Sequence, residues 1–168
     1  MTLLDLRKSV ADTLAQWYPA AECKTAPGRM NLAELKRSTV KTPAIRVACL
    51  GLPAGADAGD GEADHEVTFA AYVVTTDKTR LLRDDAALAM VDDLVSRLPG
   101  ARWGSAEVWP VRADTIIAEN LYSSQIGGTG VALWGVVWTQ KVRIGENAYP
   151  QGPILSAQLY ADDGEGPP

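Results

Sequence analysis

The feature that most constrains this chain is the stretch GVALWGVVWTQKVRIG, residues 130–145. It is rich in β-branched and aromatic residues and lies between glycines, which predicts one long β-strand. Successive side chains of a strand point to opposite faces. We expect one face to form part of the core beneath helices, because it is apolar at nearly every position: Ala132, Trp134, Val136, Trp138, Gln140, Val142 and Ile144.

The opposite face of this strand changes character halfway along. The first half is apolar and contains Val131, Leu133 and Val137. The second half is polar and contains Thr139, Lys141 and Arg143. Two interpretations stay open for the apolar half: loops of the same chain cover it, or a second subunit does. Trp109, beside Pro110, favours a subunit interface, because aromatic residues are enriched there.

The remaining pattern alternates helices and strands. Amphipathic spacing predicts a helix over 3–17, capped by Thr2, and a helix over 83–100, capped by Asp84. Strands are expected at 43–53 and 66–77, and extended pieces at 105–112 and 114–123. This order predicts an α+β fold, with two helices packed on one face of a mostly antiparallel β-sheet and a β-hairpin extension.

Other segments lack a regular pattern. We expect a loop over 20–31, a short helix or an edge strand over 32–40, and a mobile turn at SSQIGGTG. Residues 1–146 should form a single domain. Residues 147–168 should form an extended C-terminal arm and a disordered acidic tail. The arm's Ile154 and Leu155 are candidates for a strand added to a neighbouring subunit.

Charge and composition exclude several classes of protein. The net charge is −5, and the stretches 54–66 and 161–168 hold 8 of the 21 acidic residues and none of the 16 basic ones. The chain has no basic stripe of the kind that binds nucleic acid and no apolar run long enough for a membrane span. The start of the chain resembles no secretion signal, and Cys23 and Cys49 are expected to be reduced thiols.

Residues with catalytic chemistry do not form a recognisable set. His65 is the only histidine, and it lies in a glycine-rich acidic segment where a preorganised base is not expected. The spacing of Cys23, Cys49 and His65 matches no zinc pattern, and DGEAD at 60–64 lacks the glycine and the closing glutamate of a calcium loop. GGTG at 127–130 has no lysine after it, unlike a phosphate loop. We therefore expect no enzyme, no cofactor and no metal.

Four features of the sequence point to a known family of proteins. They are the order of elements, the AENLYSS segment, the glycine-rich turn and the closing ALWGVVWTQKVRIG strand. Over about residues 3–146 the chain resembles the tail-terminator and tail-completion proteins of long-tailed phages, in particular the Mu-like phage tail protein family. Rival interpretations are a head-tail connector or minor tail subunit, a non-viral small α+β binding module and, last, an enzyme.

The resemblance implies a structural protein of the virion, at the head-proximal end of the tail, assembled in the host cytoplasm. Its subunits would form a homo-oligomeric ring, usually a hexamer, that caps the tail tube protein, stops its polymerisation and presents a surface to the head-tail connector protein. A closed ring brings two different patches of each subunit together. No membrane takes part.

The resemblance also implies that DNA passes through the ring without specific binding. An acidic channel lining would repel phosphates. We therefore expect the acidic segment, with Asp57, Asp60, Glu62 and Asp64, or else the acidic tail, to face the channel or to serve as a docking loop.

Overall fold

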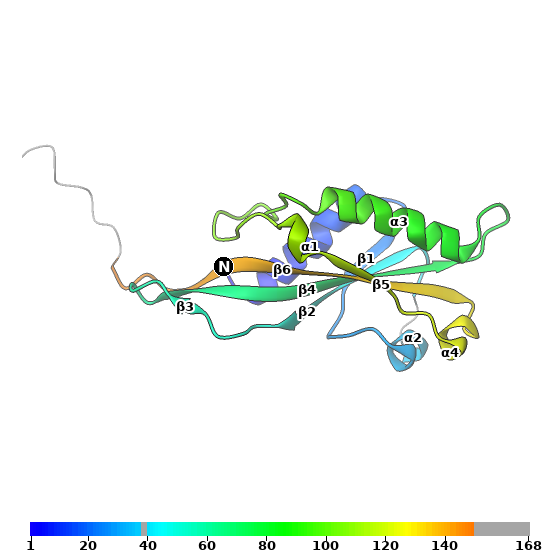
Figure 1. The fold of residues 1–168 in the computed structure, drawn as a ribbon, viewed down its shortest axis with the longest axis horizontal. Helices are drawn as coiled ribbons and strands as arrows, with labels where there is room; N and C mark the ends of the chain where they lie inside the picture. Colours follow the sequence, from blue (N-terminus) through cyan, green and yellow to red (C-terminus); the bar gives the residue numbers. More distant parts are fainter. Residues whose placement is uncertain (38–39, 150–168) are drawn as a thin grey trace, which may run out of the picture.

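The computed structural model describes residues 1–37 and 40–149, which build a six-stranded sheet with helices on both faces (Figure 1). The elements are α1 (Leu3–Trp17), β1 (Glu22–Thr25), α2 (Leu32–Arg37), β2 (Ala44–Gly51), β3 (Ala56–Asp57), β4 (Glu62–Thr76), α3 (Arg83–Arg97), the 3-10 turn η1 (Ala113–Thr115), β5 (Ile117–Asn120), α4 (Ser124–Gly127) and β6 (Val131–Gly145).

The strands run in the order β1-β2-β4-β6-β5, and β3 pairs with the end of β4. All pairs are antiparallel except β1 with β2. The centre of the sheet is the pair of 15-residue strands β4 and β6, in register from Glu62 opposite Gly145 to Thr76 opposite Val131. The predicted α+β fold with a mostly antiparallel sheet is confirmed.

The two long helices, α1 and α3, lie on one face of the sheet (Figure 1). The main core fills the space between them and the sheet, and the predicted core face of β6 lies there, with Val136, Trp138 and Val142 buried. Trp138 stacks on Phe69 with ring centroids 5.8 Å apart. Burial of such large side chains is the main force that holds the helices on this face.

The ends of the two helices differ. Thr2 caps α1 as predicted: its hydroxyl accepts from the Asp5 N–H at 3.1 Å, and the Asp5 carboxylate completes the capping box. The prediction that Asp84 caps α3 is wrong, because the cap position is Leu82, which makes no side-chain capping bond. Asp84 and Asp85 lie instead in the first helical turn, where their charges suit the helix dipole.

The second face of the sheet carries a smaller core. Chain segments around Met30 and α2, together with α4, cover one end of it, where Ile126 and Leu133 are buried. The expected mobile turn is therefore the short helix α4, and the expected loop over 20–31 contains β1. The expected extended piece at 105–112 contributes a single bridge, Val108 to Val142, and no strand.

The acidic segment 54–66 is ordered as a hairpin extension, not as a flexible loop. β3 and the first residues of β4 continue the sheet beyond the helices, alongside the end of β6 (Figure 1). The turn is fixed locally, because the Asp57 carboxylate accepts from the Gly59 N–H at 2.8 Å and Gly59 has a φ of 82°. We call residues 57–62 the hairpin tip. Within the described residues, no helix is long and apolar enough to cross a bilayer.

Candidate interaction surface on the open face of the sheet

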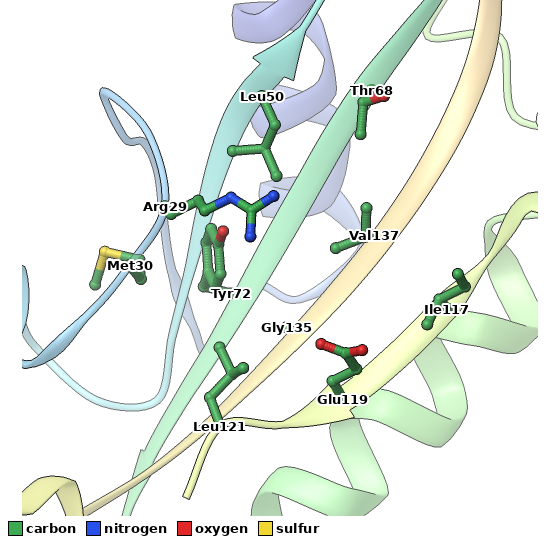
Figure 2. A pocket seen from close by; sticks show the side chains of 10 residues that line it. All are labelled: Arg29, Met30, Leu50, Thr68, Tyr72, Ile117, Glu119, Leu121, Gly135 and Val137. Carbon is green, nitrogen blue, oxygen red and sulfur yellow. The ribbon is translucent and has the colours of Figure 1, made fainter. Parts of the chain in front are cut away.

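The middle of the sheet face opposite α1 and α3 is left uncovered and forms a groove of about 340 Å³ (Figure 2). We call it the open-face groove. Its lining comes from the chain before α2 and from β2, β4, β5 and β6: Arg29, Met30, Leu50, Thr68, Tyr72, Ile117, Glu119, Leu121, Gly135 and Val137.

The floor of the groove contains a large and a small residue that face each other. Tyr72 and Gly135 are cross-strand partners on β4 and β6. A Cβ on residue 135 would lie 3.4 Å from the Tyr72 ring and 3.4 Å from Leu121, at the distance of ordinary van der Waals contact, so both side chains lie over the strand at this glycine. Burial raises the pKa of Tyr72, and a hydrogen bond with the Met30 backbone opposes that shift. The phenol therefore stays neutral near pH 7.

The walls of the groove are mainly apolar, with one charge of each sign. Arg29 lies on one side and Glu119 on the other, and Figure 2 shows both side chains directed toward the space between them. Ile117, on the β5 wall, is 59% exposed. Such a strip is suited to a polypeptide, whose side chains can bury against the walls while its backbone meets a strand edge.

That strand edge is β5. The Leu121 N–H donates to the Leu133 carbonyl at 2.9 Å, which makes these residues a hydrogen-bonded pair with β6. Hydrogen-bonded and non-hydrogen-bonded pairs alternate in an antiparallel ladder, so the backbone groups of Ala118 and Asn120 point away from β6. All four residues of β5 are exposed, and no other strand of the described residues pairs with this edge.

The predicted interface residues of β6 fall into different environments. Val137 lies in the open-face groove, and Val131 is partly buried against the smaller core. Leu133 is only 1% exposed, because it packs within its own chain in the cluster that also holds Ile126 and Met30. The prediction of Leu133 as an exposed interface residue is therefore wrong. Coverage by the same chain, the alternative left open above, applies at this position.

Trp109 lies further along the same face, in a neighbouring hollow also lined by Glu66, Arg112 and Lys141. Its ring lies under two cations, at 4.7 Å from the Lys141 ammonium and 5.3 Å from the Arg143 guanidinium. Thr68 and Thr139, which are cross-strand partners, separate this hollow from the open-face groove. Trp109 is partly buried and stays a candidate interface residue.

Asp64 does not project from the hairpin as a free acid. Its carboxylate pairs with Arg143 and with Lys141, each at 2.8 Å, and its side chain is 13% exposed. The hydrogen bonds from Arg143 and Lys141 lower the pKa of Asp64 to about 2. Asp64 is thus part of the hairpin's own structure, and Asp57, Asp60 and Glu62 are the predicted acids that remain at the tip.

Some predicted site residues are placed and others are not. Asp57 is exposed at the hairpin tip, while Asp60 and Glu62 are partly exposed. Asp60 accepts from the Glu62 N–H at 3.0 Å. Ile154 and Leu155 lie outside the described residues.

Sequence reasoning missed most of the groove. Ile117, Glu119 and Leu121 recur at every second position, which is the pattern of one strand face, so the wall on β5 had a readable signal. Arg29 and Met30 had none, because they precede α2 in an irregular segment. No three His, Cys, Asp or Glu side chains of the described residues are grouped so that they could hold a metal ion.

Comparison of the chain with protein-family models and with curated proteins finds no match.

Proposed function

We propose that this protein is a structural subunit of a phage tail. Its copies form a ring on the end of the tail tube, which ends polymerisation of the tube protein and provides a surface for head attachment. The observation that carries the proposal is the uneven covering of the sheet. Both long helices lie on one face, and the middle of the other face stays open beside an exposed strand edge.

A ring requires two different surfaces on each subunit. The open-face groove with the β5 edge offers one. A second candidate is the exposed apolar patch at the start of α3, formed by Leu81, Leu82 and Leu88. Leu82 is 63% exposed at a helix cap position where Ser, Thr, Asp or Asn would stabilise the helix better. A partner at this patch would account for leucine there.

The hairpin extension fits the same proposal. It projects beyond the helical layer and carries Asp57, Asp60 and Glu62 at or beside its tip (Figure 1). In a ring around DNA, acids on such a projection would repel the phosphates and keep the DNA from sticking.

The test is co-expression with the tail-tube protein encoded in the same genome, followed by electron microscopy and mass measurement of the particles. We expect the protein to form a closed ring, both alone and at the ends of tubes. Tubes that carry the ring should stop growing. A protein that stays monomeric and never associates with tubes would overturn the proposal.

Two alternatives make different predictions in the same experiment. A head-tail connector or minor tail subunit would form rings that bind head-side proteins or the tail tip and leave tube length unchanged. A non-viral binding module would stay monomeric, and its open-face groove and β5 edge would bind an extended peptide.

A further inference from the structure

The outer edge of β5 presents backbone N–H and C=O groups, and no strand of the described residues lies beside it. The outward backbone groups of Ala118 and Asn120 can pair with one more strand. Ile117 points from this edge onto the open face and is largely exposed. An added strand would therefore gain hydrogen bonds from the edge and apolar contact from Ile117.

A segment of suitable chemistry lies in the chain beyond residue 149. Residues 147–161 contain no charged side chain, and within ILSAQLY, residues 154–160, the five residues 155–159 alternate between apolar and polar, with Ile154 and Tyr160 at the two ends. Leu155, Ala157 and Leu159 fall on one face of an extended strand, with Ser156 and Gln158 on the other. The segment itself brings no charge to the edge, which limits the cost of desolvation to that of Glu119 on β5.

We propose that residues 154–160 of one copy add as a strand to the β5 edge of a neighbouring copy. Leu155, Ala157 and Leu159 then extend the apolar wall that Ile117 begins at the open-face groove. The inference rests on the proposed function only in that it requires copies of this chain to meet.

The point where the described chain ends favours a neighbouring copy over the same chain. The Ala148 N–H donates to the Asp60 carbonyl at 2.6 Å, so the chain leaves from the hairpin tip, beyond the helices (Figure 1). Ile117 pairs with Val137, which precedes Gly145 by eight residues, or roughly 27 Å along the strand. From Tyr149 to Leu155, six residues span at most about 22 Å when fully extended. Leu155 of the same chain therefore falls short of Ile117. Only the last residues of the segment, such as Leu159 at up to about 36 Å from Tyr149, could reach it, so the same chain cannot lay the whole segment along β5.

The test is disulfide trapping between two full-length chains in which Cys23→Ser and Cys49→Ser remove the native thiols. One chain carries an affinity tag and Glu119→Cys. The untagged chain carries Leu155→Cys, Ala157→Cys or Leu159→Cys, so that three registers are covered. Neighbouring antiparallel strands place Cα atoms about 4.5–5.5 Å apart, within the range that a disulfide bridges.

We expect a dimer of tagged and untagged chains in at least one of the three mixtures. Ser156→Cys and Gln158→Cys, on the other face of the segment, are the matched controls and should give no such dimer with Glu119→Cys. A second control replaces Glu119→Cys with Asp92→Cys on the exposed surface of α3. The tagged chain with Asp92→Cys should give no mixed dimer with a cysteine at any position of the segment.

Three outcomes would overturn the proposal: no mixed dimer from any pair, equal dimer from the controls, or cross-links only within one chain when both cysteines are placed in it. The two proposals fail separately. Mixed dimers from a protein that never associates with tubes would support the strand exchange and overturn the tail function. Rings on tubes without mixed dimers would support the tail function and overturn the strand exchange.

Discussion

Gln140 is a buried polar side chain beside the core beneath α1 and α3. Its amide accepts from the Trp103 indole N–H at 2.7 Å and donates to the carbonyls of Ala101 and Trp109 at 3.0 and 2.6 Å. It thereby ties the segment after α3 to β6. The sequence places Gln140 on the apolar face of the strand, but that pattern does not identify its hydrogen-bond partners.

Replacing this amide by a side chain of similar size should be costly. We expect Gln140→Leu to lower the free energy of unfolding by roughly 2–4 kcal/mol, because buried hydrogen-bonding groups lose their partners. Urea unfolding measures the change. Thr139→Val, at the next position and on the other face, is the control and should change stability by about 0.5 kcal/mol or less. Equal losses from both variants would contradict this role of Gln140.

The ionisation of Asp64 gives a prediction of pH dependence. Its pKa in the folded protein, about 2, lies below the ordinary value of 3.8, so its ion pairs stabilise the hairpin fully above the ordinary value. That contribution is lost as the pH falls from about 4 toward 2. A carboxyl-carbon NMR titration should find the low pKa, and Arg143→Gln should raise it toward 3.8.

The control for this titration is Arg97→Gln. Arg97 pairs with Asp93 on α3, and its removal leaves the partners of Asp64 in place. An unchanged Asp64 pKa in Arg143→Gln would show that the ion pair does not cause the shift.

At the scale of elements, the open side of β6 divides into a covered and an uncovered part. Leu133 packs beneath α4, whereas Ile117 on β5 is exposed beside the open-face groove. We expect Leu133→Ala to cost about 2–5 kcal/mol of unfolding free energy. Ile117→Ala should change it by about 0.5 kcal/mol or less. Chemical denaturation of both variants checks the difference.

The two positions should also differ in assembly. Ile117→Lys should leave the monomer folded and weaken association, whereas Asp12→Lys, on the exposed surface of α1 and away from both proposed interfaces, should leave association unchanged. Mass measurement in solution separates these results. Unchanged association of Ile117→Lys would remove the β5 wall from the proposed interface.

The long elements could be predicted because each repeats one pattern many times. The apolar stripes of α1 and α3 and the alternation of β6 extend over 15 residues each. The four-residue elements β1 and α4 could not, because four residues are too few for a strand or helix pattern to repeat recognisably. The site depends on these short elements. Leu133 and Val137 have the same character and the same face in the sequence, and the positions of α4 and of the segments around Met30 and α2 decide that Leu133 is covered.

At the scale of the whole molecule, the sheet separates two kinds of surface. One side is a closed core under two helices, and the other combines a partly open face, a strand edge and a projecting hairpin (Figure 1). The nonpolar surface of the open-face groove and the charged hairpin tip therefore lie at different places along the sheet. Substitutions at the hairpin tip should therefore change how DNA interacts with the proposed ring and leave ring formation unchanged.

The tip can be neutralised without breaking its turn. Asp57→Asn and Asp60→Asn keep a side-chain oxygen for the N–H groups of Gly59 and Glu62, and Glu62→Gln removes the third charge. If the tip faces a channel for DNA, the triple variant should form rings of unchanged mass that bind duplex DNA more tightly at low salt, because phosphate repulsion is reduced. Fluorescence anisotropy with labelled duplex DNA measures this change.

The matched control removes the same charge from the helical layer. Asp12→Asn, Asp85→Asn and Asp92→Asn alter exposed positions on α1 and α3. Long-range electrostatics alone would make both triple variants bind DNA equally, since each changes the net charge by the same amount. A channel-facing tip makes only the first variant bind more tightly, because its charges lie close to the phosphates and short distances escape screening. Equal binding by the two variants would therefore place the tip away from the path of the DNA.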